Sequence, residues 1–262
     1  MRVSDRIRVI GERREYLRFT TSQRLQHVFM FVPFTVLVVT GFPIKFPDSS
    51  FWTWVVDVFG GIGNIRSLHR IAAVVMIVDF CFHVVYMLFN IVRNRTRVKD
   101  MHLLPDRQDL RDIRDNLRHF LFLTDERPRF RRFSYLEKFD YWAVFWGMFI
   151  MAGSGLILWH PEEAGRWLPA SAIQIAYVAH SDEALLAFLA IVIWHFYNVH
   201  FNPRVWPANK VWYKGALSEE RMREEHPREL EEILEQLKRG RQRRHDDVGD
   251  GQGPQDGRDG GA

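Results

Sequence analysis

Four histidines form two pairs, and the spacing within each pair places both side chains on one face of a membrane-spanning helix. His69 and His83 lie fourteen residues apart, and His180 and His195 lie fifteen apart. In an α-helix these separations correspond to about 21 and 22 Å along the axis and to rotations of about 40° and 60°. Neutral imidazole is a common axial ligand of haem iron. Each apolar helix would therefore present one such ligand near each membrane face.

The two histidine-bearing helices would run in the same direction, because they are the second and fourth of four membrane spans. Pairing His69 with His180, and His83 with His195, then gives an outer and an inner bis-imidazole site. Ionisable groups inside a membrane are costly and tend to mark function. A single histidine would be interpreted as a packed or hydrogen-bonded side chain, whereas four at matched depths predict two haem sites.

Four apolar segments must position these histidines. Hydrophobic residues make up 47% of the 262 residues, with 21 Phe and 9 Trp. Hydropathy over windows of about 20 residues places the spans at 25–45, 71–92, 141–159 and 184–201. The arginine-rich start lacks the apolar core of a cleavable signal peptide. The expected fold class is an all-α membrane protein, a four-transmembrane-helix bundle with haems between the helices.

Basic residues indicate the orientation. The N-terminal arm, the segment between the second and third spans and the C-terminal tail are rich in Lys and Arg, whereas the other two loops have few. The positive-inside rule therefore places both termini and the middle loop in the cytoplasm. The net charge of +4 reflects this topology and attraction to anionic membrane lipid, rather than binding of nucleic acid.

Four segments are expected in chain order. Residues 1–24 form a cytoplasmic arm, and residues 25–203 form the membrane domain, with a cytoplasmic loop at 93–138. Residues 204–239 form a cytoplasmic helical extension, and the Gly- and Asp-rich residues 240–262 form a disordered tail. The middle loop alternates charged and apolar residues, a pattern typical of an amphipathic surface helix.

Several short motifs follow one another in the order found in a known family. They are QRLQH and a later Gly41 in the first span, IRSLH in the second, SGLILWHP in the third, HSDEALL and WHFYNVH in the fourth, and KGALSEERMREEHP beyond it. In this order they resemble the di-haem cytochrome b subunits of membrane-bound formate dehydrogenases and nickel–iron hydrogenases. The resemblance covers residues 24–232.

This resemblance implies transmembrane electron transfer through b-type haem, between a partner redox subunit and the quinone or menaquinone pool. The partner would be a soluble or periplasmic subunit with iron–sulfur or multihaem centres, and the location would be the bacterial inner membrane. The single Cys81 excludes an iron–sulfur cluster held by this chain alone, so a separate subunit must supply the substrate chemistry. Because no CxxCH motif occurs, the haems would be bound noncovalently.

The ligands of the inner haem remain open. In the formate dehydrogenase subunit this haem uses the histidine at the start of the first span, here His27, with the second histidine of the fourth span, and nothing corresponds to His83. Either His27 replaces His83 as the partner of His195, or an additional site exists. His200 lies at about the depth expected of His27, which gives the hypothesis of a third haem between them. Hydrogen-bonded interfacial histidines are the alternative.

Carboxylates near the inner level are candidates for proton transfer. The related subunits bind quinone where Glu137 and Asp140 enter the third span, and quinone reduction takes up two protons with two electrons. Both are therefore candidate proton donors, with interfacial anchoring as the alternative. Asp79, one turn before His83, is a further candidate that structural hydrogen bonding explains equally well. Small residues at 152–155 favour close helix packing or leave room for a planar cofactor.

Two other classes of function use the same features. The histidines could serve a proton- or metal-translocating membrane protein, or the chain could be a haem-free membrane anchor of a redox complex. A haem with two imidazole ligands has no open coordination position, so the cytochrome interpretation predicts electron transfer rather than oxygen chemistry. Its direction is open, because quinol oxidation and quinone reduction would use the same residues.

Overall fold

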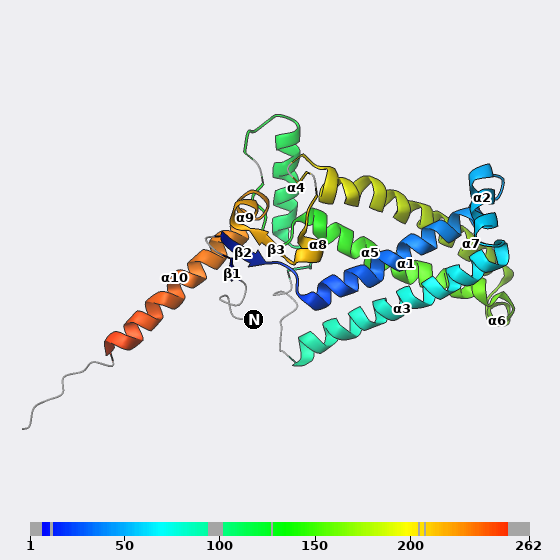
Figure 1. Ribbon diagram of the computed structural model, residues 1–262, viewed down its shortest axis with the longest axis horizontal. Helices are drawn as coiled ribbons and strands as arrows, with labels where there is room; N and C mark the ends of the chain where they lie inside the picture. Colours follow the sequence, from blue (N-terminus) through cyan, green and yellow to red (C-terminus); the bar gives the residue numbers. More distant parts are fainter. Residues whose placement is uncertain are drawn as a thin grey trace, which may run out of the picture. The chain divides into compact units, whose positions relative to one another are not determined.

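The computed structural model describes residues 7–10, 13–93, 102–126, 128–203, 205–206 and 208–250 (Figure 1). The chain divides into two compact units. We call one the strand unit, which comprises Met1–Arg18, Leu110–Ser134 and Ala216–Ala262. We call the other the helical unit, which comprises Phe19–Asp109 and Tyr135–Gly215.

The helical unit contains four long apolar helices, α1 (Thr21–Lys45), α3 (Ile62–Arg93), α5 (Tyr135–Trp159) and α7 (Ala170–Leu189). α7 continues in π-helical form as η3 (Ala190–His195) and η4 (Tyr197–Phe201). All four are long and apolar enough to cross a membrane, which confirms the predicted four-helix fold. Each begins earlier than hydropathy indicates, because helical hydrogen bonding continues through polar residues that an apolar window leaves out.

The long helices associate mainly as two pairs, α1 with α3 and α5 with α7. Two short helices, α2 (Ser50–Val58) and α6 (Pro161–Gly165), lie at one end of the bundle, and α8 (Val211–Lys214) lies at the other (Figure 1). At most 17% of the residues in the apolar part of any span are buried within the chain. Such exposure suits helices in lipid, whose apolar side chains need no protein cover.

The start of α1 is fixed by local hydrogen bonds. The hydroxyl of Thr20 accepts a bond from the backbone N–H of Gln23, and the Gln23 side chain accepts one from the backbone of Thr20, which is a capping box. The backbone N–H of Phe19 donates to the carbonyl of Gly215 at 3.1 Å. Gly215 has a φ of 79°, and a Cβ there would lie 2.7 Å from the Phe19 oxygen, so only glycine fits.

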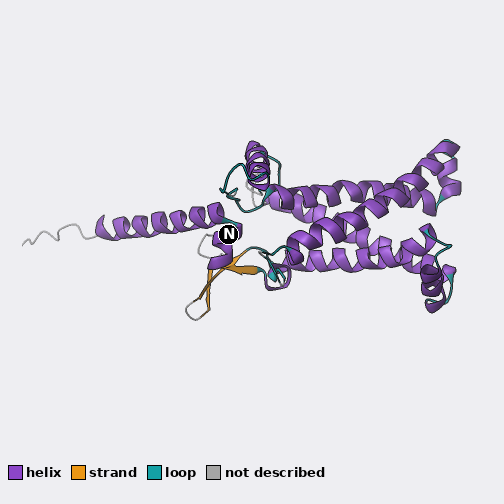
Figure 2. Ribbon diagram, turned by 90° about the horizontal axis from the view of Figure 1, so that it is seen from above, coloured by secondary structure: helices purple, strands orange, loops and turns teal. Residues whose placement is uncertain are grey.

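The strand unit contains a small antiparallel sheet in the order β1 (Ile7–Ile10), β2 (Arg13–Leu17) and β3 (Ala216–Ser218), drawn orange in Figure 2. Tyr16 of β2 pairs with Leu217 of β3, and both side chains are buried. The sheet joins the N-terminal arm to the start of the C-terminal extension. It was not predicted. β1 and β2 are neighbours in the sequence, with Ile10 paired to Arg13, whereas the pairing of β2 with β3 joins segments far apart in the sequence and leaves no local pattern.

Three helices accompany the sheet, α4 (Arg107–Phe120), most of which belongs to this unit, α9 (Glu219–Glu225) and α10 (Pro227–Asp250). The Glu229 carboxylate forms ion pairs with Arg18 and Arg132. Burial alone would raise the pKa of Glu229, but the two positive charges outweigh it and hold this pKa below its usual range. The network ties the arm, the middle loop and the C-terminal extension together.

α10 extends into the segment that was expected to be disordered, and the remaining residues 251–262 of that tail lie outside the described residues. Leu230 and Ile233 on its first turns are buried. The start of α10 is therefore packed within the strand unit.

Candidate functional site

His69 on α3 and His180 on α7 face each other within the helical unit. Their ring centroids are 6.3 Å apart and their planes are inclined at 68°. Two imidazoles on opposite sides of one metal, with nitrogen–metal bonds of about 2 Å and a ring radius of about 1.1 Å, would have centroids about 6.2 Å apart. This outer pair therefore has the separation that a shared axial metal requires.

Hydroxyl groups orient both rings of the outer pair. Nδ1 of His69 lies 2.9 Å from Oγ1 of Thr40, and Nδ1 of His180 lies 3.1 Å from Oγ of Ser154. Each hydroxyl donates its own proton to a backbone carbonyl one turn earlier in its helix. The hydroxyl oxygens consequently accept a hydrogen bond from Nδ1–H of each ring. The lone pair of each neutral imidazole is then on Nε2, on the side of the ring away from the hydroxyl. Hydrogen bonds to the ring nitrogen opposite the metal fix the orientation of metal-binding histidines.

Two glycines lie against the same rings. A Cβ on Gly41 of α1 would lie 3.4 Å from Cε1 of His69, and a Cβ on Gly155 of α5 would lie 3.1 Å from Cε1 of His180. Gly155 belongs to the group of small residues at 152–155, and it makes room for the His180 ring. A Cβ at position 155 would crowd the His180 ring, whereas one at position 41 would make an ordinary van der Waals contact with the His69 ring.

At the opposite level of the bundle, His27 on α1 lies against His195 on η3. The ring centroids are 6.5 Å apart, with an interplanar angle of 34°. Nδ1 of His195 lies 3.1 Å from a carboxylate oxygen of Asp140. Nδ1 of His27 is buried and has no hydrogen-bond partner among the described residues. This inner pair also has a separation that suits two axial imidazoles.

His83 is held in a different way. Its Nδ1 lies 2.8 Å from Oε1 of Gln26, and its Nε2 lies 3.0 Å from the hydroxyl of Tyr141. Both ring nitrogens are thus engaged in hydrogen bonds. In the described part of the chain, ring contacts join His195 to His27 and not to His83.

The remaining sequence-predicted residues lie near the inner pair or apart from it. His200 contacts the rings of Phe196 and Phe201, and no ring contact joins it to His27 among the described residues. Asp140 reaches the inner pair through His195, whereas Glu137 is half-buried in the first turn of α5. The described residues also contain no group of three or more His, Cys, Asp or Glu that could hold a metal ion.

The two helix pairs repeat the same plan. α5 begins and ends 114 residues after α1 begins and ends. The same offset relates Thr40 to Ser154 and Gln26 to Asp140. In each pair the first helix supplies the hydroxyl for the outer histidine, and it also supplies the side chain bound to Nδ1 of the inner histidine.

The π-helical turn of η3 explains the unequal histidine spacings. One more residue separates His180 from His195 than separates His69 from His83. Bonding from residue i to i+5 in Ala190–His195 takes up this extra residue. The rotation of about 60° expected for a continuous α-helix therefore does not apply to this helix.

Sequence analysis missed Thr40, Ser154, Gln26 and Tyr141. A signal for the first two exists in the sequence, because TGFPIKFP and SGLILWHP both combine a hydroxyl residue, a glycine and a proline seven residues after the hydroxyl. An internal comparison at an offset of 114 would have identified them. It would also have aligned Gln26 with Asp140 and His27 with Tyr141, the two inner positions at which the halves differ in chemistry.

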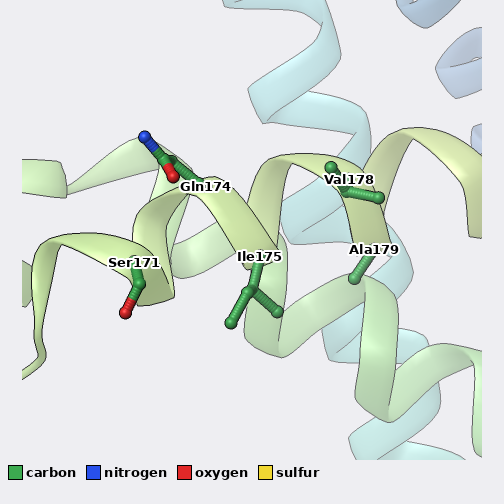
Figure 3. A pocket seen from close by; sticks show the side chains of 5 residues that line it. All are labelled: Ser171, Gln174, Ile175, Val178 and Ala179. Carbon is green, nitrogen blue, oxygen red and sulfur yellow. The ribbon is translucent and has the colours of Figure 1, made fainter.

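A shallow pocket of about 380 Å³ lies on one face of α7 (Figure 3). Its lining consists of Ser171, Gln174, Ile175, Val178 and Ala179. None of these side chains is ionisable or a usual haem ligand. The histidine pairs, rather than this pocket, are therefore the candidate site.

Comparisons with known proteins cover the whole of this site. The sequence profile described as prokaryotic cytochrome b561 matches residues 18–212. The formate dehydrogenase cytochrome b556(fdo) subunit of Escherichia coli K12 is 24% identical over 203 residues, which cover 77% of this chain and 82% of the relative. The formate dehydrogenase cytochrome b556 subunit of Haemophilus influenzae is 20% identical over 201 residues, which cover 77% and 73% respectively. The profile match includes all four long helices and both histidine pairs.

Proposed function

Because the chain belongs to the prokaryotic cytochrome b561 family, we propose that it transfers electrons between a partner redox subunit and the quinone pool. Members of this family transfer electrons through b-type haem in a membrane. The observation that carries this proposal is the presence of two imidazole pairs at two levels of one bundle. Thirteen residues of α1 separate Thr40, at the outer pair, from His27, or about 20 Å of helix. This distance covers most of a hydrocarbon core of about 30 Å.

We assign His69 and His180 to an outer haem, and His27 and His195 to an inner haem. The ring separations, the hydrogen bonds at Nδ1 of the outer rings and the glycines beside these rings all support this assignment. A b-type haem held by these histidines would supply a one-electron carrier. His83 then acts as a hydrogen-bonding residue, and no third haem is held between His27 and His200.

The residues around the two pairs would give the haems different properties. The outer histidines donate to neutral hydroxyls, whereas His195 donates to the carboxylate of Asp140. A carboxylate acceptor makes the imidazole a stronger donor to iron and stabilises the oxidised state. Asp140 is thus a positioning and tuning residue that lowers the reduction potential of the inner haem.

We place the quinone or menaquinone site at the inner end of the bundle, where α5 begins. Glu137 lies in the first turn of this helix, and Asp140 follows one turn later beside His195. Both carboxylates are candidates for proton exchange with the quinone. Exchanging Glu137 for Gln should slow quinone turnover while haem content is unchanged, and unchanged turnover would exclude Glu137 as the donor.

The relatives support the proposed redox partner subunit, and the charge distribution supports the proposed orientation of the chain in the membrane. The Escherichia coli and Haemophilus influenzae relatives are named as subunits of formate dehydrogenase. We propose, by analogy, a partner subunit with iron–sulfur or multihaem centres. The basic arm, middle loop and tail support, by the positive-inside rule, the proposal that both termini lie on the cytoplasmic side of a bacterial inner membrane.

Reduction of the purified chain by a soluble quinol tests the proposed function. We expect Soret and α bands of low-spin haem in the detergent-solubilised protein, and full reduction of both haems when menadiol is added. Absence of haem bands would favour the membrane-anchor or transporter alternatives. Haem bands that respond to dithionite but not to the quinol would contradict the link to quinone while retaining the cytochrome.

A further inference from the structure

Helix α4 carries an apolar face that the rest of the described chain leaves uncovered. Leu110 and Phe120 are 69% and 67% exposed, and Ile113 and Leu117 between them are exposed as well. At 100° per residue these four side chains fall within an arc of about 80°. A continuous apolar stripe of this kind on a surface helix needs a partner that is itself apolar.

The apolar face continues past the end of the helix. The backbone N–H of Phe122 donates to the carbonyl of His119, and that of Leu123 donates to the carbonyl of Arg118. These two bonds form a Schellman cap, whose left-handed residue is usually glycine. Here that residue is Phe122, with a φ of 56° and a side chain that is 96% exposed. In water this segment would combine a strained backbone with an exposed ring, whereas apolar surroundings for the ring would offset that strain.

Arginines line one side of this apolar face. Four exposed arginines recur at helical spacing, Arg107, Arg111, Arg114 and Arg118. They form a row that lies directly beside the apolar arc when the helix is viewed along its axis. An apolar stripe flanked by cations is the pattern of a helix that lies in a membrane interface, because the cations reach anionic headgroups.

The acidic side of α4 is occupied by other parts of the chain. Within the helical unit, Nζ of Lys138 on α5 lies 2.9 and 2.8 Å from the two carboxylate oxygens of Asp109. Within the strand unit, Arg228 forms an ion pair of 3.7 Å with Asp112. Lys138 is the fourth residue of a membrane-spanning helix, so its bond fixes the first turn of α4 beside the end of that span.

We propose that α4 and residues 121–123 lie in the plane of the membrane surface at which α3 ends and α5 begins. Leu110, Leu117 and Phe122 enter the boundary between headgroups and acyl chains, and the arginine row contacts anionic phospholipid. Lipid fits this face because the helix is tethered to a span by Lys138, and because the cations beside its apolar stripe complement the phosphates of the headgroups. The helix would then hold the middle loop flat against the bilayer.

Spin-label accessibility in nanodiscs that contain one purified, haem-loaded chain each tests this placement. Single cysteines would be introduced as Leu117→Cys and Phe122→Cys in a Cys81→Ser background, because Cys81 is exposed. Arg111→Cys on the polar side of the same helix is the matched control. The discs would contain phosphatidylcholine, with or without phosphatidylglycerol. An unchanged Soret spectrum would establish that each variant is folded.

We expect labels at positions 117 and 122 to collide more often with oxygen and several-fold less often with a water-soluble nickel chelate than the label at position 111. Phosphatidylglycerol should increase this difference, and Arg114→Gln with Arg118→Gln should abolish the increase. Equal nickel accessibility at all three positions would overturn the proposal and leave the face for a partner protein or a second copy of the chain. If the difference in accessibility between these positions is the same with and without phosphatidylglycerol, the proposed role of the arginine row is wrong.

Discussion

The helix pair α1–α3 and the helix pair α5–α7 have the same plan and differ at two positions of their inner ends. Both contain a hydroxyl residue followed by glycine at the outer histidine. At the inner level, however, α1 contains Gln26 and His27, and α5 contains Asp140 and Tyr141 at the matching positions. The outer site is therefore symmetric between the pairs, and the inner site is not.

This difference explains why four histidines at the inner level and its edge would supply only one haem. His27 faces His195 across a gap that suits a metal, whereas the matching Tyr141 lies within hydrogen-bond distance of His83. A phenol at 3.0 Å from Nε2 leaves no space for iron between the two groups. The matching positions thus differ in role. His27 can form a ligand pair with His195, whereas Tyr141 forms a hydrogen bond with His83.

The largest expected effect comes from removing one inner histidine at a time. His27→Ala should lower the haem content from two per chain to one, because His195 loses its facing imidazole. His83→Ala should retain both haems, because its ring forms only hydrogen bonds. Haem per protein, measured by the pyridine haemochrome assay, distinguishes the variants. Loss of a haem from His83→Ala with no loss from His27→Ala would reverse the assignment.

A smaller effect is expected from the hydroxyls of the outer pair. Thr40→Val and Ser154→Ala each remove the acceptor at Nδ1 of one outer ring. Loss of such a hydrogen bond to a ligating histidine typically weakens metal binding about 10–100-fold. Both variants should release the outer haem more readily to apomyoglobin, to a similar extent, because the halves match here. A marked effect of one substitution alone would break the proposed symmetry of the outer site.

The carboxylate at the inner pair should change a potential rather than haem content. Asp140→Asn should raise the midpoint potential of the inner haem by tens of millivolts, because a neutral acceptor stabilises oxidised iron less than a carboxylate does. Gln26→Leu is the matched control, since it removes the acceptor at Nδ1 of His83 without changing the charge beside His27, and it should shift neither haem. Redox titration followed in the α band would measure both. A shift in the control variant would indicate that His83 is a ligand.

The smallest expected effect is a difference between alanine substitutions at the two glycines beside the outer pair. Gly155→Ala would bring a Cβ to 3.1 Å from the His180 ring, whereas Gly41→Ala would bring one to 3.4 Å from the His69 ring. The first distance requires the ring to move, and the second is an ordinary van der Waals contact. Low-temperature electron paramagnetic resonance should therefore reveal a changed outer-haem g tensor in Gly155→Ala and little change in Gly41→Ala. Equal spectra would mean that the ring of His180 has room to adjust.

Sequence patterns predicted the four-helix fold because long apolar runs have few alternatives to membrane helices. The pairing of His69 with His180 was also predicted, from helical spacing and from the parallel direction of the second and fourth spans, and their rings do face each other. The partner of His195 was not predicted uniquely. His27 and His83 both lie at about the depth of His195, and depth along a helix does not say which neighbouring helix supplies the facing ring. The pairing of β2 with β3 and the ion pairs of Glu229 join segments far apart in sequence, so no local pattern predicts them.

Haem stoichiometry of the unmodified chain tests the central claim most directly. Protein purified in detergent, with its concentration fixed by quantitative amino-acid analysis, would be converted to the pyridine haemochrome and its haem b content measured. Two haems per chain are predicted, one between His69 and His180 and one between His27 and His195. Three haems per chain would require a further site at His83 or His200 and would contradict the account.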